Sequence, residues 1–190
     1  MANPPVFGLT GGIASGKSTV ARLLEKRGFA IVNADLISRE LSQEGGAAHS
    51  ALLHRFGTAN RAELRKLVFA DESARKDLEK ILHPLIRAES QRRIQALGSA
   101  KAIIYEAALL VETGRQSEFA GLIVVEAPCE DRIMRLLARD GIDRKTAERI
   151  LAAQLSDEAR RASATWVIHN AGSLQELEAE VERVASLLVP

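Results

Sequence analysis

The chain has 190 residues, which is enough for one substantial core and too short for two ordinary domains joined by a linker. Its 26 lysines and arginines nearly balance 25 aspartates and glutamates, so the net charge of +1 excludes a strong overall attraction to nucleic acid or to a membrane surface. Cys129 is the only cysteine, which excludes an intramolecular disulfide and a cysteine-based zinc cluster. We expect Cys129 to be a small buried filler residue in a protein of a reducing compartment.

No stretch of the sequence has the pattern of a membrane span or an export signal. Residues 1–5 lack a basic region followed by an apolar run, and nowhere do about eighteen apolar residues occur together. We therefore expect a soluble, cytoplasmic protein with no membrane partner and no nucleic-acid partner. The oligomeric state stays open, and a monomer is compatible with the sequence.

Short apolar runs alternate along the chain with longer amphipathic segments. The runs that have the length and uniform hydrophobicity of buried strands are Val6–Leu9, Phe29–Val32, Ala102–Tyr105, Leu122–Val125 and Trp166–Ile168. The helical segments between and after them include Ser18–Arg27 with Gly28 as a left-handed C-cap, a helix from Asp143 to about Leu155, and a last helix that opens on a Ser173 and Glu176 capping box. This alternation predicts an α/β fold in which helices cover both faces of a five-stranded parallel sheet.

Two connections are longer than a simple crossover between parallel strands requires. Ligands of such sheets bind at the carboxyl ends of the strands, and inserted segments at that edge tend to cover the site. We therefore expect one domain, residues 1–190, with three parts. Its core comprises about residues 1–35, 101–129 and 164–190, a helical substrate-binding insertion comprises about residues 36–100, and a lid comprises about residues 130–163.

The stretch GGIASGKST carries the strongest chemical signal in the sequence. It fits the pattern G-x-x-x-x-G-K-[ST] and lies between a predicted strand and a predicted helix. In such a phosphate loop, backbone N–H groups surround a phosphate, a lysine adds a positive charge at the β and γ phosphates, and a hydroxyl binds Mg²⁺. The residues predicted to bind ATP here are Gly11, Gly12, Ile13, Ala14, Ser15, Gly16, Lys17, Ser18 and Thr19, with Ser18 holding Mg²⁺ together with the ATP phosphates.

Two carboxylates follow other predicted strands. Asp35 comes just after the second strand and Glu106 just after the third. A carboxylate near a phosphate loop can accept a proton from an attacking hydroxyl or hold Mg²⁺ through water. Asp35 could instead cap the helix that follows it, and Glu106 could either support the metal ion or cap a helix.

Arg132, Arg135 and Arg139 recur at helical spacing and share one helix face in the predicted lid. Such a row of charged side chains usually lies on the solvent-exposed face of a helix. In a phosphoryl-transfer enzyme, however, lid arginines neutralise charge on the γ-phosphate and exclude water. We favour Arg139 for this role because it lies next to the Gly141 turn, where a lid would fold over.

Several segments resemble the dephospho-coenzyme A kinase family in order and spacing. They are GLTGGIASGKSTVARLLEKRGFAIVNADLISRE, ILHPLI, EAALLVETG, LLARDG, RILAAQ and WVIHNAGS, and together they extend over nearly the whole chain. The resemblance implies ATP-dependent phosphorylation of the ribose 3′-hydroxyl of dephospho-coenzyme A, the last step of coenzyme A biosynthesis. It also implies a P-loop fold with a helical acceptor domain and a lid.

The resemblance also implies roles for individual residues. Asp35 matches the family's catalytic base, and Lys17 and Arg139 complete the predicted catalytic set. The residues implied at the acceptor are Asp35, Arg39, His83, Glu106 and Leu109. Asn170 and Gly172 fall in the segment expected near the adenine of ATP.

The sequence departs from the family pattern at several positions. Asn33 replaces the first aspartate of an Asp-Ala-Asp motif, Ala14 stands where many members have glycine, and Ala108 and His169 replace a proline and an aspartate. The segment between Gly57 and Leu64 is shorter than usual and lacks an aspartate-glycine turn, which affects the expected geometry of the acceptor region.

Other residues have structural interpretations beside the functional ones. His83 precedes Pro84, which is expected to kink or start a helix, and a packed, hydrogen-bonded histidine is as compatible with the pattern as a substrate contact. No histidine spacing suggests a metal site, and Trp166 is expected to pack in the core. Two alternatives stay open: another P-loop kinase acting on a nucleoside monophosphate or a sugar, and a nucleotide-dependent switch or ATPase.

Overall fold

The computed structural model describes residues 3–188. Contacts divide the chain into two compact units. One, which we call the core unit, is formed by the chain up to Val32 and from Leu97 onward. The other, which we call the helical unit, is formed by Asn33–Ala96.

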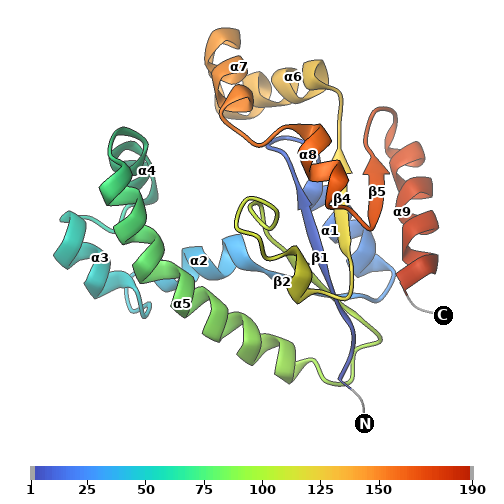
Figure 1. The fold of residues 1–190 in the computed structure, drawn as a ribbon, viewed down its shortest axis with the longest axis horizontal. Helices are drawn as coiled ribbons and strands as arrows, with labels where there is room; N and C mark the ends of the chain where they lie inside the picture. The colour runs from blue at the N-terminus through green and yellow to red at the C-terminus, as the bar shows by residue number, and fades with distance from the viewer. Residues whose placement is uncertain (1–2, 189–190) are drawn as a thin grey trace. The chain divides into compact units, whose positions relative to one another are not determined.

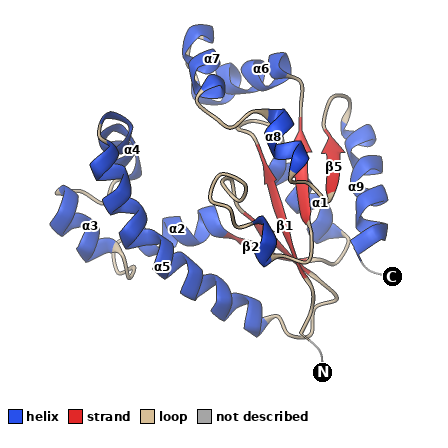
Figure 2. Ribbon diagram, in the orientation of Figure 1, coloured by secondary structure: helices blue, strands red, loops and turns tan. Residues whose placement is uncertain are grey.

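The core unit is built on a five-stranded sheet with the order β2-β3-β1-β4-β5 (Figures 1 and 2). Its strands are β1 (Val6–Gly11), β2 (Ala30–Asn33), β3 (Ile103–Glu106), β4 (Leu122–Glu126) and β5 (Trp166–His169). Central β1 pairs in parallel with β3, starting at Val6 opposite Ile103, and with β4, starting at Gly8 opposite Leu122. The predicted fold class, a five-stranded parallel sheet flanked by helices, is confirmed.

The core unit also contains several helices. They are α1 (Lys17–Lys26), α6 (Cys129–Asp140), α7 (Arg144–Ala152), α8 (Asp157–Ala162) and α9 (Leu174–Leu188), with a short 3-10 helix at Gln116–Glu118. The main hydrophobic core joins strand residues such as Leu9 to Leu24 of α1 and Val181 of α9, all fully buried. Trp166 packs against this core and meets Phe7 edge to face, as predicted.

The ends of α1 and α9 follow the predicted signals. Gly28, just after α1, has a φ of 84°, the left-handed conformation that glycine adopts without a steric penalty. At α9, the Ser173 hydroxyl accepts a hydrogen bond from the Glu176 N–H, and the Glu176 carboxylate accepts one from the Ser173 N–H. The bond from the Ser173 N–H lowers the pKa of the Glu176 carboxyl below its usual range.

Two predictions about this unit are wrong in detail. The helix expected from Asp143 to about Leu155 ends at Ala152, and α8 follows because the Ser156 hydroxyl accepts a hydrogen bond from the Ala159 N–H and caps a new helix. Cys129 is exposed rather than buried, because it is the first residue of α6.

The helical unit consists of α2 (Ala34–Ser42), α3 (His49–Phe56), α4 (Arg61–Ala70) and α5 (Glu72–Ala96). The other three helices contact the long helix α5, and Ala48, Leu52 and Leu64 form the buried centre of the unit (Figure 1). Helix α5 neither starts nor stops at Pro84 but runs through it. Pro84 is exposed, so water can hydrate the Lys80 carbonyl that has lost its helical partner.

None of the described helices is both long and apolar enough to cross a membrane.

Candidate active site

The phosphate loop predicted from the sequence connects central strand β1 to helix α1. Gly16 caps α1 with a φ of 96°, and a side chain there would also collide with the amide of Asn170, so only glycine fits. Because α1 starts at Lys17, its N-terminal N–H groups and the positive end of its dipole face the loop. The buried Ser15 hydroxyl has no hydrogen-bond partner among the described residues, which suits a group that would meet a ligand.

A buried carboxylate lies against the two reactive side chains of this loop. Oε1 of Glu106 accepts a hydrogen bond from Lys17 Nζ at 2.8 Å and one from Ser18 Oγ at 3.0 Å. Glu106 is 2% exposed and the Lys17 side chain is 12% exposed, so the pair is shielded from water. Removing one partner of such a pair leaves an uncompensated buried charge, which typically costs about 3–5 kcal/mol.

The sequence left two roles open for Glu106, and the prediction that it caps a helix is wrong. Glu106 is the last residue of β3, and turns follow it as far as the 3-10 helix at Gln116. Its alternative role, support of a metal ion, stays a prediction. The Ser18 hydroxyl and the Glu106 carboxylate are oxygen donors of the kind that Mg²⁺ prefers, so the residues present fit this ion.

The arginines of α6 divide into two groups. Arg132 and Arg135 are not part of a solvated face, because both donate hydrogen bonds to carbonyl oxygens of the phosphate loop. Arg139 is exposed, and it donates to its neighbour Asp140 at 2.7 Å. This contact raises the pKa of the Arg139 guanidinium above its usual value. The structure therefore brings Arg132 and Arg135 to the loop, and the role of Arg139 stays a prediction.

The segment expected near the adenine follows β5. Asn170 is buried and its side-chain amide donates to the Ser15 carbonyl at 2.8 Å, so it is in contact with the phosphate loop. Gly172 lies against the Glu176 carboxylate, which a side chain at this position would displace. Leu109 is 52% exposed in the turns after β3.

Asp35 lies in the first turn of α2 and is exposed. The interpretation of Asp35 as the N-cap is wrong, because the cap is Asn33, whose side chain accepts a hydrogen bond from the Leu36 N–H at 2.8 Å. Asn33, which replaces the first aspartate of the family's Asp-Ala-Asp motif, is therefore a good capping residue itself. Arg39 lies one turn further along α2, and His83 is exposed on α5 rather than packed.

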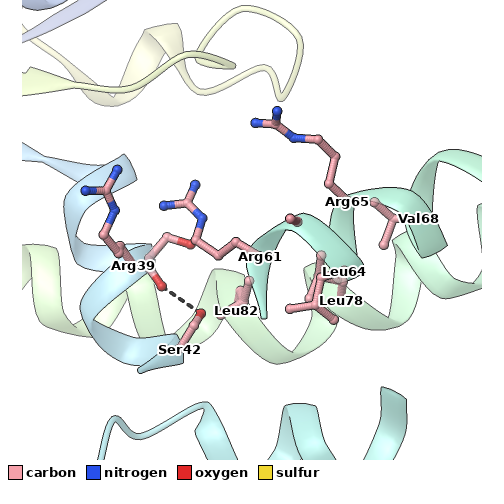
Figure 3. Close-up of a pocket in the computed structure, with 10 residues that line it drawn as sticks. Arg39, Ser42, Arg61, Leu64, Arg65, Val68, Leu78 and Leu82 are labelled. Carbon is pink, nitrogen blue, oxygen red and sulfur yellow. Dashed lines mark hydrogen bonds between the residues drawn. The ribbon is translucent and has the colours of Figure 1, made fainter. Parts of the chain in front are cut away.

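A pocket of about 490 Å³ opens in the helical unit between α2, α4 and α5 (Figure 3). Arg39, Arg61 and Arg65 extend toward the same side of it, and Leu64, Leu78 and Leu82 supply apolar lining. The three arginines are exposed, and none of their guanidinium groups has a hydrogen-bond or ion-pair partner among the residues that the structure describes. An apolar surface beside three such cations favours a ligand that is part anionic and part apolar.

Arg61 and Arg65 are absent from the site predicted from the sequence. Their spacing of four residues places them on one helix face, and this spacing is the feature of the sequence that could have identified them. Gln154 is also new to the site, since its side chain accepts a hydrogen bond from the Ile13 N–H at 2.9 Å.

Ala14 is a strained position in the phosphate loop and provides a stability test. Its φ of 59° is left-handed, which costs a residue with a side chain roughly 1–2 kcal/mol, whereas glycine adds about 0.4–1 kcal/mol of unfolded-state entropy. Ala14→Gly should therefore stabilise the protein by up to about 1 kcal/mol, a rise in melting temperature of about 2–4 °C. A thermal melt checks this result. Ala88→Gly, in the regular helix α5, should have the opposite sign, and a fall for Ala14→Gly as well would contradict the strain argument.

Comparison with known proteins agrees with this geometry over most of the chain. Residues 5–176 match the family model described as dephospho-CoA kinase. A relative from Geobacter sulfurreducens named dephospho-CoA kinase is 40% identical over 189 residues, which cover 94% of this chain and 96% of that protein. The solved structure of TT1252 from Thermus thermophilus has a TM-score of 0.86 and 33% identity over 100% of both chains. Dephospho-CoA kinase from Campylobacter jejuni has a TM-score of 0.64 and 27% identity over 99% of both chains. The chain belongs to the dephospho-CoA kinase family.

Proposed function

We propose that this chain transfers the γ-phosphoryl group of ATP to the ribose 3′-hydroxyl of dephospho-coenzyme A, giving coenzyme A and ADP. The observation that carries this proposal is the phosphate loop before α1, where buried Glu106 holds both Lys17 and Ser18. The loop and the helix N-terminus suit the phosphates of a nucleotide. The relatives' names supply the acceptor.

In this proposal Asp35 is the general base that takes the proton from the attacking 3′-hydroxyl. Its support is its place two residues after β2, whose carboxyl end belongs to the same edge of the sheet as the end of β1. Lys17 supplies positive charge to the transferred phosphoryl group, and Arg139 supplies it from the lid, residues 130–163. Asn170 and Gly172 are assigned to the adenine side of the ATP site.

Mg²⁺ completes the proposed set of small molecules. Ser18 would hold the ion through its hydroxyl, with Glu106 beside it and the ATP phosphates as further ligands. When bound, the ion neutralises charge on the phosphate oxygens of ATP. Lys17, the first residue of α1, would add its positive charge at the same phosphates.

We assign acceptor binding to the helical unit, with the pocket at Arg61 and Arg65 taking the diphosphate of dephospho-coenzyme A. Guanidinium groups recognise phosphate oxygens through paired, charge-assisted hydrogen bonds, and the neighbouring leucines suit the apolar parts of the pantetheine arm. Arg39 lines the same pocket, and Leu109 and His83 are assigned to the acceptor as the family resemblance implies. A cytoplasmic location goes with this function.

Arg65→Ala tests the acceptor pocket. We expect the KM for dephospho-coenzyme A to rise about tenfold or more, because a charge-assisted hydrogen bond to phosphate is lost, while the KM for ATP stays within about twofold. Steady-state kinetics with each substrate varied in turn measures both values. Lys66→Ala is the matched control, since it removes the same charge from the same helix outside the pocket lining. Equal effects of the two variants would contradict the assignment.

The function itself is tested by ADP release from ATP and Mg²⁺, with and without an acceptor. We expect strong stimulation by dephospho-coenzyme A and little by adenylates, nucleosides or gluconate. Stimulation by one of those acceptors instead would indicate a different small-molecule kinase. ADP release that no acceptor changes would indicate an ATPase or a nucleotide switch.

A further inference from the structure

Side chains from distant parts of the core unit hold the outer side of the phosphate loop. Three consecutive carbonyl oxygens are each bound: Ile13 by Arg132 Nε at 2.9 Å, Ala14 by Arg135 Nη1 at 3.1 Å, and Ser15 by the Asn170 amide at 2.8 Å. The peptide plane is rigid, and its C=O and N–H point in opposite directions. Fixing a carbonyl on the outer side therefore directs the next N–H group toward the phosphate side.

Ile13 is held at both of its backbone groups. Oε1 of Gln154 accepts a hydrogen bond from the Ile13 N–H at 2.9 Å and another from Arg132 Nη2 at 3.0 Å. Arg132 and Gln154 thus form one hydrogen-bonded unit that binds both the N–H and the carbonyl of the same loop residue. This contact fixes the orientation of Ile13 relative to α6 and to the end of α7.

The position of Arg132 is fixed in turn by burial and by a carboxylate. Arg132 is 4% exposed, and its Nη1 donates to both oxygens of Asp157, each at 3.0 Å. Asp157 also accepts a hydrogen bond from Arg160 at 3.0 Å, and Arg160 is 1% exposed. Because Nε, Nη1 and Nη2 of buried Arg132 all donate hydrogen bonds, this guanidinium has little freedom to adopt a second arrangement.

Gly12 gives independent support for the importance of the contact between Arg132 and the phosphate loop. The phosphate-loop pattern permits any residue at this position, yet a side chain on Gly12 would collide with the guanidinium of Arg132. The glycine therefore leaves space for the arginine rather than for a phosphate.

We propose that Arg132 and Gln154 are positioning residues for the nucleotide. They touch no reacting atom, and they act by holding the Ile13 peptide so that the N–H groups after it face the phosphates before ATP arrives. The proposal rests on the ATP-dependent function above and extends it, because it assigns part of nucleotide affinity to side chains outside the loop. Such preorganised N–H groups bind phosphate without a reorganisation cost.

The pair Gln154→Met and Gln154→Glu tests this proposal. Methionine has nearly the same shape but cannot accept the two hydrogen bonds, whereas glutamate retains an acceptor oxygen. For Gln154→Met we expect the KM for ATP and the Kd for ADP to rise about tenfold, because the Ile13 N–H loses its partner. The KM for dephospho-coenzyme A should stay within about twofold, and Gln154→Glu should restore ADP binding to within about threefold of the unmodified protein.

Gln175→Met, at an exposed position of α9, is the matched control and should change none of these constants. Unchanged ADP binding in Gln154→Met would overturn the proposal. So would an equal loss for both substrates, or a loss that Gln154→Glu does not rescue, because each indicates a general structural role. If the unmodified protein binds ADP but does not phosphorylate dephospho-coenzyme A, the proposed function fails. The ADP-binding comparison then still decides the role of Gln154.

Discussion

Asp35→Asn should lower kcat with saturating dephospho-coenzyme A by about 10²- to 10⁴-fold, the range expected when a general base is lost. The amide has almost the same size as the carboxylate but cannot accept the proton of the 3′-hydroxyl. Asp35 is exposed in the first turn of α2, and Asn33 provides the cap, so the helix should form without the charge. Steady-state kinetics measures the change, and circular dichroism checks the fold.

Glu72→Gln is the matched control for Asp35→Asn. Glu72 is also a first-turn carboxylate of a helix in the helical unit, so this variant loses a similar helix-dipole interaction without touching the proposed base. Its kcat should stay within about twofold of the unmodified protein. If Asp35→Asn is folded and as active as this control, Asp35 is not the base.

Lys17→Met should lower kcat/KM for ATP by about 10²- to 10³-fold, because the positive charge acts on the phosphates in both the ground state and the transition state. The same change removes the positive charge that lies 2.8 Å from the buried Glu106 carboxylate. We therefore also expect a loss of stability of about 3–5 kcal/mol in the nucleotide-free protein. Kinetics and chemical denaturation measure the two effects separately.

The double variant Lys17→Met, Glu106→Gln separates catalysis from folding. Removing both charges leaves a neutral amide beside Ser18, so most of the lost stability should return. Activity should not return, because the charge at the phosphates is still missing. Recovery of activity along with stability would show that Lys17 acts only as the structural partner of Glu106.

The strands and the phosphate loop could be predicted because their signals are local. Apolar runs marked the five strands to within two residues at either end, and the loop motif placed Lys17 and Ser18 at the start of α1. Gly28 and the Ser173 capping box marked helix ends for the same reason. Each of these features depends on residues that are close together in the sequence.

Contacts between residues that are far apart in the sequence could not be predicted in this way. Helical spacing put Arg132 and Arg135 on one face, but only the fold shows that this face meets the loop more than a hundred residues earlier. The contact of Gln154 with Ile13 has no local signal either. Asp35 was ambiguous between base and cap because an aspartate suits both, and the structure resolved the capping by showing Asn33 in that place.

The most direct test of the account is to identify the product formed from ATP, Mg²⁺ and dephospho-coenzyme A. Chromatography against authentic coenzyme A, with phosphorus NMR of the isolated product, locates the transferred phosphoryl group. The account predicts coenzyme A phosphorylated at the ribose 3′-hydroxyl, formed in equal amount to ADP. Inorganic phosphate and ADP without this product, or phosphate attached at another position, would contradict it.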